Sequence, residues 1–287
     1  MERSSKYCPR TCFLTSKADW RHSLSEMSAT GGQSAFNPAG AAYGTGYCDA
    51  QCPVQNWING VANINNTYGA CCNEMDLWEA NSAATAFTPH PCNVTGLYEC
   101  EGLLCGPGNN RYTGVCDEDG CGFNAYKNGA PNFYGKGANM TVDTNKKFTV
   151  VTQFITTDNT TTGALKEIRR IYVQNGKVIQ NSKVNLPGRA AVNSEDDTYC
   201  SAAKFHQQGA MAGMGGAIGR GMVLIFSIWD DASGGMLWLD GNSGTTPADA
   251  NGPCPATLLN EADLMAQHSD ASVTFSNVKS GELGSTF

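Results

Sequence analysis

Apolar and β-branched residues recur in short runs along this chain, a pattern that is typical of strands. Two runs, residues 147–157 (KFTVVTQFITT) and 221–229 (GMVLIFSIW), are rich in β-branched and aromatic side chains. Residues 271–278 (ASVTFSNV) instead alternate apolar with polar positions, as a strand with one buried face does. The pattern predicts a strand in each of these three segments.

A hairpin and a few short helices complete the expected elements. Residues 168–180 (IRRIYVQNGKVIQ) should form two strands that turn at Asn175-Gly176, a dipeptide typical of two-residue hairpin turns. Short helices are expected only within residues 201–218 and 256–267. Many strands joined by loops rich in Gly and Asn predict an all-β fold, a two-sheet antiparallel β-sandwich.

One predicted strand, residues 71–79 (CCNEMDLWE), concentrates three carboxylates in a short stretch. Glu74 and Asp76 are two positions apart, so their side chains share one face of a strand. Glu79 has the opposite parity and reaches that face only if a bulge or bend lies between Asp76 and Glu79. Trp78 should point to the other face, into the core.

These acids suit a glycosidic bond, which needs one carboxyl group as nucleophile and a second as proton donor. Acids that alternate with apolar residues also describe any half-solvated strand. Spacing alone therefore leaves catalysis and an ordinary solvated face as alternatives, and the flanking sequence has to decide between them.

Length and charge narrow the classes of function. The chain has 287 residues, and β-sandwiches of about 200–250 residues commonly form one domain. Its net charge is −7 and no Lys/Arg cluster is available to neutralise phosphates, which argues against nucleic acid as a partner. There is no run of about 18 apolar residues, so no membrane span is expected.

Thirteen cysteines are far more than a reduced cytosolic enzyme normally carries, and the C-x₂-C or His-rich spacing of a zinc site is absent. A disulfide framework and no metal site are therefore expected. Cys71 and Cys72 are neighbours on a strand and point to opposite faces, so each needs its own partner. Cys48 and Cys52 are well spaced to supply them.

Four segments together resemble glycoside hydrolase family 7, the fungal retaining cellulases. They are residues 40–53 (GAAYGTGYCDAQCP), 68–92 (YGACCNEMDLWEANSAATAFTPHPC), 221–240 (GMVLIFSIWDDASGGMLWLD) and 273–287 (VTFSNVKSGELGSTF). The E-x-D-x-x-E core is highly specific in that setting. The resemblance runs over residues 24–287 and implies the C-terminal portion of the catalytic domain, a curved concanavalin-like jelly roll with a substrate cleft along its concave sheet.

Residues 1–23 do not match the family, whose members are considerably longer at this end. The segment has no apolar core of about 7–15 residues and no small-residue cleavage site, so it does not read as a signal peptide. We expect an aberrant start, such as a truncated or wrongly joined gene, and a sandwich that is incomplete at the N-terminus.

The resemblance implies roles for the three acids. Glu74 is the expected nucleophile that forms a glycosyl-enzyme intermediate, and Glu79 the expected acid/base that protonates the leaving oxygen and then activates water. Asp76 is expected to hydrogen-bond Glu74 and set its ionisation.

Further residues match family positions that bind sugar. His90 matches a position near the scissile bond, although a lone histidine could also be structural. Trp229 and Trp238 match sugar platforms, and core packing is the alternative for each tryptophan. Arg111 matches a product-side arginine, with a solvated loop arginine as the alternative. The remaining expected cleft residues are Tyr43, Tyr47, Asp49 and Gln51.

The resemblance also implies the disulfide pairing: Cys48 with Cys72, Cys52 with Cys71, Cys92 with Cys116, Cys100 with Cys105, and Cys121 with Cys200. Cys254 would pair with a cysteine in the segment that family members have and this chain lacks.

The implied function is retaining hydrolysis of β-1,4-glucosidic bonds in cellulose or a related glucan, by a secreted, monomeric glycoprotein without a cofactor. Endo action is favoured by residues 226–230 and the short stretch after Trp238, whereas Arg111 and residues 116–121 are closer to a cellobiohydrolase. A non-catalytic carbohydrate-binding protein is the alternative from another class, although a lectin has no need of a spaced acid pair. A compromised catalyst is the third possibility.

Overall fold

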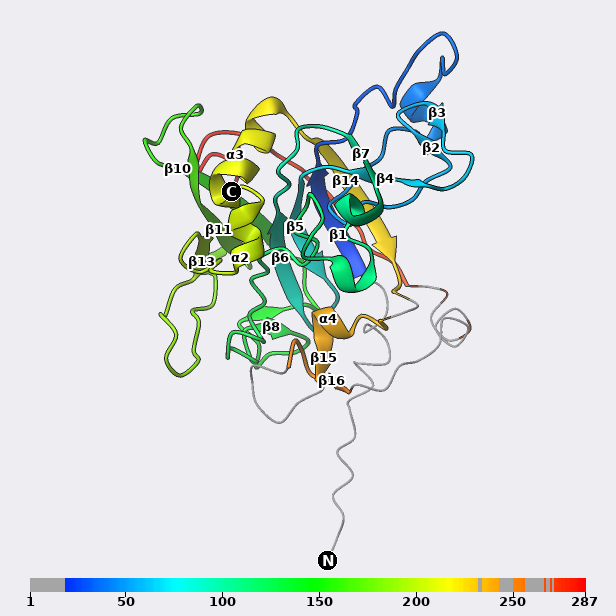
Figure 1. Ribbon diagram of the computed structural model, residues 1–287. Coiled ribbons are helices and arrows are strands. Elements are labelled where there is room, and N and C mark those ends of the chain that lie inside the picture. Colours follow the sequence, from blue (N-terminus) through cyan, green and yellow to red (C-terminus); the bar gives the residue numbers. More distant parts are fainter. Residues whose placement is uncertain (1–18, 232–233, 243–249, 256–265, 267–268, 270) are drawn as a thin grey trace, which may run out of the picture.

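The computed structural model describes residues 19–231, 234–242, 250–255, 266, 269 and 271–287 of the chain. They form two main sheets, in which every pair of neighbouring strands is antiparallel (Figure 1). The first sheet has the order β14-β1-β5-β6. Its strands are β1 (Asp19–Ser25), β5 (Glu74–Ala80), β6 (Thr85–His90) and β14 (Val223–Trp229). The predicted strand-rich, antiparallel architecture is therefore present.

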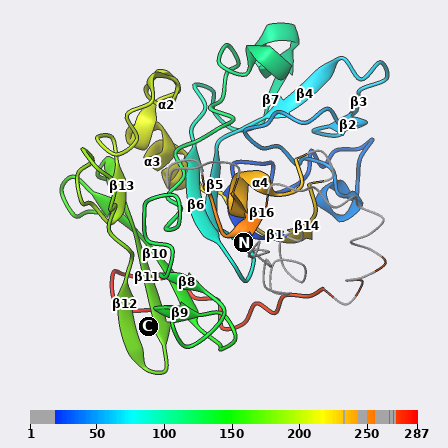
Figure 2. The same ribbon diagram turned by 90° about the horizontal axis from the view of Figure 1, so that it is seen from below.

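The second sheet has the order β10-β11-β12, with a short strand β13 that also pairs with β11. Its strands are β10 (Thr149–Thr156), β11 (Leu165–Gln174), β12 (Lys177–Gln180) and β13 (Ser194–Asp196). Figure 2 shows this sheet beside the first, with the C-terminal segment in red passing along both.

Short elements lie outside the two main sheets. The strand pairs are β2 (Trp57–Ile58) with β3 (Val61–Ala62), β4 (Tyr68–Cys71) with β7 (Tyr98–Glu101), β8 (Tyr134–Gly135) with β9 (Val142–Asp143), and β15 (Gly241–Asn242) with β16 (Cys254–Pro255). The helices are η1 (Gly40–Tyr43), η2 (Gly102–Cys105), η3 (Gly108–Asn110), α2 (Ala203–Gln207), α3 (Ala210–Arg220) and α4 (Leu237–Asp240). Within the described part of the chain, no helix combines the length and apolarity that crossing a bilayer requires.

Most of the predicted elements form where the pattern placed them. Strands β10 and β14 occupy the two apolar runs, and α2 and α3 occupy the first predicted helical region. The hairpin β11–β12 turns at Asn175 and Gly176, whose φ values of 54° and 73° are the positive angles that this turn requires. The second helical prediction falls largely on residues 256–265 and 267, which lie outside the described residues.

The strand predicted for residues 271–278 is wrong, because this segment has no strand pairing among the described residues. Its alternation reflects packing instead. The ring of Phe275 lies 6.1 Å from that of Trp78 and 4.8 Å from that of Phe226. An alternating pattern indicates which side chains are buried. An extended segment can bury alternate side chains without hydrogen-bonding to another strand.

The side chains opposite the three acids build the core. Met75 is fully buried in a cluster with Phe87 and Ile168, and Trp78 is 6% exposed in a neighbouring cluster with Tyr172. Strand β5 thus presents Met75 and Trp78 to apolar clusters and leaves its carboxylates for the other face, as the strand parity predicts.

Among the described residues, five disulfides tie the loops to the sheets, and their pairing is the one that the family resemblance implies: Cys48–Cys72, Cys52–Cys71, Cys92–Cys116, Cys100–Cys105 and Cys121–Cys200. Two of them attach residues 48–52 to the chain just before β5. The sulfur atoms of Cys52, Cys71 and Cys100 lie within 4.8 Å of one another, but all three belong to disulfides and are not available as metal ligands.

The expected boundary between residues 23 and 24 falls inside β1. This strand lies between β5 and β14, in the middle of the first sheet. Residues 19–23 are therefore part of the sheet, and this has consequences for the acids described below. Residues 1–18 lie outside the described residues.

Strand β14 pairs only with β1 among the described strands, and it exposes apolar side chains. Leu224, Phe226 and Ile228 are 38%, 42% and 46% exposed, and the first two line a groove of about 1410 Å³ between the two main sheets. An edge strand with an exposed apolar face is an aggregation site.

We expect Leu224→Lys combined with Ile228→Lys to reduce aggregation on concentration, measured by light scattering, because lysines on an edge strand oppose pairing with another chain. The free energy of unfolding should change by no more than about 0.5 kcal/mol, since both positions are surface-exposed. Val61→Lys, on exposed strand β3, is the control for added charge. Equal aggregation of the double variant and the control would contradict this role of β14.

Candidate active site

The three carboxylates of β5 share one face of the first sheet. Glu74, Asp76 and Glu79 lie opposite His90, Thr88 and Ala86 of β6, respectively. The register shifts between Asp76 and Glu79, at the place where parity requires a bulge. All three side chains are buried, with exposures of 1%, 0% and 3%. Buried charges need partners, so the neighbours of this cluster determine what it can do.

The cation closest to the acids is Arg21 of β1, which faces Glu79 directly in the sheet register. Its Nη1 donates to Glu74 Oε1 at 2.9 Å and its Nη2 donates to Glu79 Oε1 at 2.8 Å. Its Nε lies 3.5 Å from Asp76 Oδ1. One guanidinium therefore joins all three carboxylates.

The second oxygen of each glutamate is held by another group. The Ala50 amide donates to Glu74 Oε2 at 3.2 Å, and the Thr88 hydroxyl donates to Glu79 Oε2 at 3.1 Å. Both glutamates are thereby fixed in orientation from one side, which is what a positioned nucleophile or acid requires.

His90 of β6 supplies a second positive charge. Its Nε2 lies 3.2 Å from Asp76 Oδ2 and its Nδ1 lies 2.9 Å from the Asp117 carbonyl oxygen. Burial opposes protonation of this ring, but the contact with Asp76 and the charges of Glu74 and Glu79 outweigh it and raise the pKa of His90 to about 10. The imidazole is therefore a cation at neutral pH.

Two of the acids, Glu74 and Asp76, resist ionisation. Burial raises the pKa of Glu74, and the charge of Asp76 adds to this effect, while Arg21 and His90 oppose it. Burial also raises the pKa of Asp76, with Arg21 as the main opposing influence. The cluster thus holds more negative charge than its environment favours, and it depends on its two cations.

The expected cleft residues of the 47–51 segment lie at the Glu74 end of the site. The Tyr47 hydroxyl donates to Asp49 Oδ2 at 2.8 Å, and the backbone amide of Gln51 donates to Asp49 Oδ1 at 2.9 Å. Burial and the charge of Glu74 raise the pKa of Asp49 to about 7 despite these bonds. The structure therefore brings Tyr47 and Asp49 beside the acids.

Helix α4, which carries Trp238, lies at the opposite end. Ala86 faces Glu79 across the β5–β6 ladder, so their side chains share one face of the sheet. Ala86 also packs against Met236 and Leu239. Helix α4 is therefore placed over the acid face at the Glu79 end, and Trp238 is 39% exposed there.

Tyr43 and Arg111 are not brought into contact with the acids. Tyr43 is 73% exposed in η1. Arg111 follows η3 and forms an ion pair with Asp119, in a loop that also touches Gln51 through the Glu118 carbonyl. The backbone of Trp229 ends β14, but its side chain lies outside the described residues.

Sequence reasoning missed Arg21, because the family resemblance was placed at residues 24–287 only. A signal was present in the alternation of this segment. Arg21, Ser23 and Ser25 fall on one face and His22 and Leu24 on the other, as in a strand. Extending the strand pattern before residue 24 would have placed Arg21 on one face of a strand, although only the fold pairs this strand with β5.

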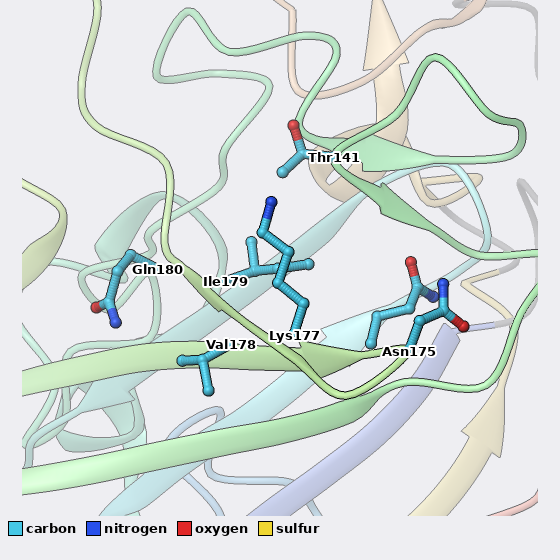
Figure 3. Close-up of a pocket in the computed structure, with 7 residues that line it drawn as sticks. Thr141, Asn175, Lys177, Val178, Ile179 and Gln180 are labelled. Atoms are coloured by element: carbon cyan, nitrogen blue, oxygen red, sulfur yellow. The ribbon is translucent and has the colours of Figure 1, made fainter.

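A second hollow lies beside the β11–β12 hairpin and is lined by Thr141, Asn175, Lys177, Ile179 and their neighbours (Figure 3). It is lined by amides, one lysine and aliphatic side chains, and its lining includes no carboxylate. The acid face of the first sheet is therefore the stronger candidate for chemistry.

A buried acid pair with fixed orientations, on the face of an antiparallel sheet, is typical of a glycosidase. The family model of glycosyl hydrolase family 7 matches residues 20–287. The chain belongs to this family, and the match begins at residue 20 rather than at residue 24.

Curated relatives support the same assignment. The chain is 55% identical to a probable endo-β-1,4-glucanase celB of Aspergillus terreus, over 92% of this chain and 60% of that protein. It is 56% identical to the corresponding protein of Aspergillus clavatus, over 92% of this chain and 59% of that one. The chain thus spans about three-fifths of the length of these relatives.

Solved structures of the family share the fold. A cellobiohydrolase from Daphnia pulex is 43% identical with a TM-score of 0.84, over 89% of this chain and 64% of that chain. The Humicola insolens endocellulase EGI is 44% identical with a TM-score of 0.77, over 89% of this chain and 62% of that chain. A Melanocarpus albomyces cellobiohydrolase in complex with cellotetraose is 33% identical with a TM-score of 0.80, over 90% of this chain and 65% of that chain.

The raised pKa of His90 predicts a pH dependence of stability. A folded pKa of about 10 lies above the ordinary histidine pKa of about 6.5, so the contribution of His90 is complete below about pH 6.5 and is lost as pH rises through about 10. Each pH unit in this window should remove up to about 1.4 kcal/mol. When urea unfolding is measured between pH 6 and 10, the free energy of unfolding should therefore fall less with rising pH for His90→Gln than for the unsubstituted chain.

The matched control for this measurement is His206→Gln, on the exposed side of α2. Groups outside the acid cluster titrate alike in the unsubstituted chain and in His90→Gln, so the difference between their curves reports His90 together with the acids that it contacts. Parallel curves for His90→Gln and the unsubstituted chain would contradict a charged His90 at neutral pH.

Proposed function

We propose that the chain hydrolyses β-1,4-glucosidic bonds in cellulose or a related glucan with retention of configuration. The observation that supports this most is the pair Glu74 and Glu79, which lie on one face of β5 close enough for a single guanidinium to bridge them. Retaining enzymes hold their carboxyl groups about 5–5.5 Å apart, and inverting enzymes leave a gap of about 6.5–9.5 Å for water. A bridged pair suits the shorter separation.

The roles of the two glutamates follow from their surroundings. Glu74, oriented by the Ala50 amide, attacks the anomeric carbon, while Glu79, oriented by Thr88, donates its proton to the leaving oxygen. The glycosidic bond breaks and a glycosyl ester of Glu74 forms. Glu79 then takes a proton from water, which attacks the anomeric carbon and releases Glu74.

Asp76 and His90 act through the nucleophile in this proposal. Asp76 lies between the two glutamates along β5, and the imidazolium of His90 contacts it from β6. Asp76 places a negative charge beside Glu74, and the imidazolium of His90 compensates that charge. Asp76 is thus a positioning residue that tunes the ionisation of Glu74, and His90 keeps Asp76 in place.

Sugar subsites would extend from the acids toward both ends of the site. Tyr47, Asp49 and Gln51 flank the Glu74 end, and exposed Trp238 on α4 offers an indole platform for a glucose ring at the Glu79 end. Roles for Tyr43, Arg111 and Trp229 in longer substrates rest on the family resemblance. The same resemblance supports a curved jelly roll, a monomer, and secretion.

We favour endo action, because the relatives named above are endo-β-1,4-glucanases. The alternative is a cellobiohydrolase, which is favoured by the loop at Arg111 and by the Daphnia pulex neighbour. Endo action creates new reducing ends within the insoluble polymer, whereas exo action places them in solution. The ratio of reducing ends in the two fractions therefore separates the two activities.

Substitution of the acids tests the assigned roles. On carboxymethylcellulose and a soluble chromogenic cellobioside, Glu74→Gln should abolish turnover because no glycosyl ester can form. Glu79→Gln should lower the rate by about 10²–10⁴, the usual contribution of general acid catalysis. Glu99→Gln, on the exposed side of β7, is the control. Activity of either active-site variant equal to that of the control would refute the assignment.

A further inference from the structure

We propose that Arg21 is an autoinhibitory residue, whose guanidinium occupies the place of the scissile bond between Glu74 and Glu79 and has to leave before sugar can bind. This inference rests on the proposed roles of the two glutamates. Arg21 would then control whether substrate reaches the two glutamates.

The first argument is the choice of oxygens. Each glutamate has one oxygen held by the scaffold, Glu74 through the Ala50 amide and Glu79 through the Thr88 hydroxyl. Arg21 binds the other oxygen of each, at 2.9 and 2.8 Å. These are the two atoms left to attack the anomeric carbon and to protonate the leaving oxygen. The guanidinium therefore excludes substrate from both reactive positions at once.

The second argument is charge. An arginine side chain stays protonated at any working pH, and a cation in contact with a carboxyl group favours its ionised form. The proposed reaction needs Glu79 with a proton. Loss of the guanidinium would leave three buried acids with His90 as their nearest cation, and proton uptake by the acids would offset the deficit. Removing Arg21 would thus remove a cation that lowers the pKa of Glu74 and of Asp76.

The third argument is that the residue is able to leave. The side chain of Arg21 is 15% exposed, while the side chains of the three acids are at most 4% exposed, so Arg21 is the outer member of the cluster. Its neighbours along the same face of β1 are the small residues Ser23 and Ser25. Rotation of the long stem toward solvent needs no change in the sheet. Occupied and open states can therefore interconvert without unfolding.

Arg21→Met removes the charge and keeps a flexible side chain of similar length. We expect cellotetraose to bind this variant at least about tenfold more tightly than the unsubstituted chain in isothermal titration calorimetry, a difference of about 1.4 kcal/mol. Arg169→Met, which removes an exposed arginine on β11, is the matched control and should bind as the unsubstituted chain does. Equal or weaker binding by Arg21→Met, including no binding at all, would overturn the proposal.

Arg21→Lys guards against a variant that does not fold, because it retains a positive charge for the buried acids. A lysine is a point charge without the planar fork that bridges two carboxylates, so it blocks only one of them at a time. Cellotetraose should bind Arg21→Lys more tightly than it binds the unsubstituted chain. This gain in affinity should be smaller than the gain caused by Arg21→Met. Unchanged affinity of a folded Arg21→Lys would also refute autoinhibition.

Hydrolysis separates this proposal from the proposed function. Arg21→Met should increase kcat on the soluble cellobioside, a gain that the loss of a merely structural arginine would not cause. Tight binding without hydrolysis would leave autoinhibition intact and refute the hydrolase assignment. Hydrolysis that depends on Glu74 but is not improved by Arg21→Met would refute autoinhibition and leave the assignment intact.

Discussion

Compensation of three buried carboxylates on one face of a sheet is the interaction on which the rest of this structure depends. Glu74, Asp76 and Glu79 are at most 3% exposed, and an unpaired buried charge is strongly destabilising. Arg21 from one neighbouring strand and His90 from the other supply the positive charge. The sheet order β1-β5-β6 is therefore also an electrostatic arrangement, with acids on the central strand and a cation on each side.

The elements around β5 can be understood as ways to hold that arrangement. The bulge after Asp76 turns Glu79 to the same face, and two disulfides fasten the 48–52 segment so that the Ala50 amide reaches Glu74. Apolar clusters on the opposite face fix the strand through Met75 and Trp78. The same contacts that make the site rigid leave Arg21 as its most exposed member.

The sequence supported predictions wherever the signal was local. Strand parity placed Glu74 and Asp76 together and required the bulge before Glu79, and Asn175-Gly176 located the hairpin. Alternation at residues 271–278 was misleading, because it reflects burial of Phe275 and not pairing. Arg21 lies 53 residues from Glu74 along the chain, so only the β1–β5 register brings them together. Contacts of that range depend on the three-dimensional fold.

A double-mutant cycle between Arg21 and Glu79 tests the central claim most directly. The free energy of unfolding is measured for the unsubstituted chain, Arg21→Met, Glu79→Gln and the variant with both changes. If the two groups form one buried charge cluster, the effects should depart from additivity by at least about 1 kcal/mol, within the range found for residues in contact. Additive effects, within about 0.5 kcal/mol, would contradict the claim that Arg21 and the carboxylates form a coupled unit.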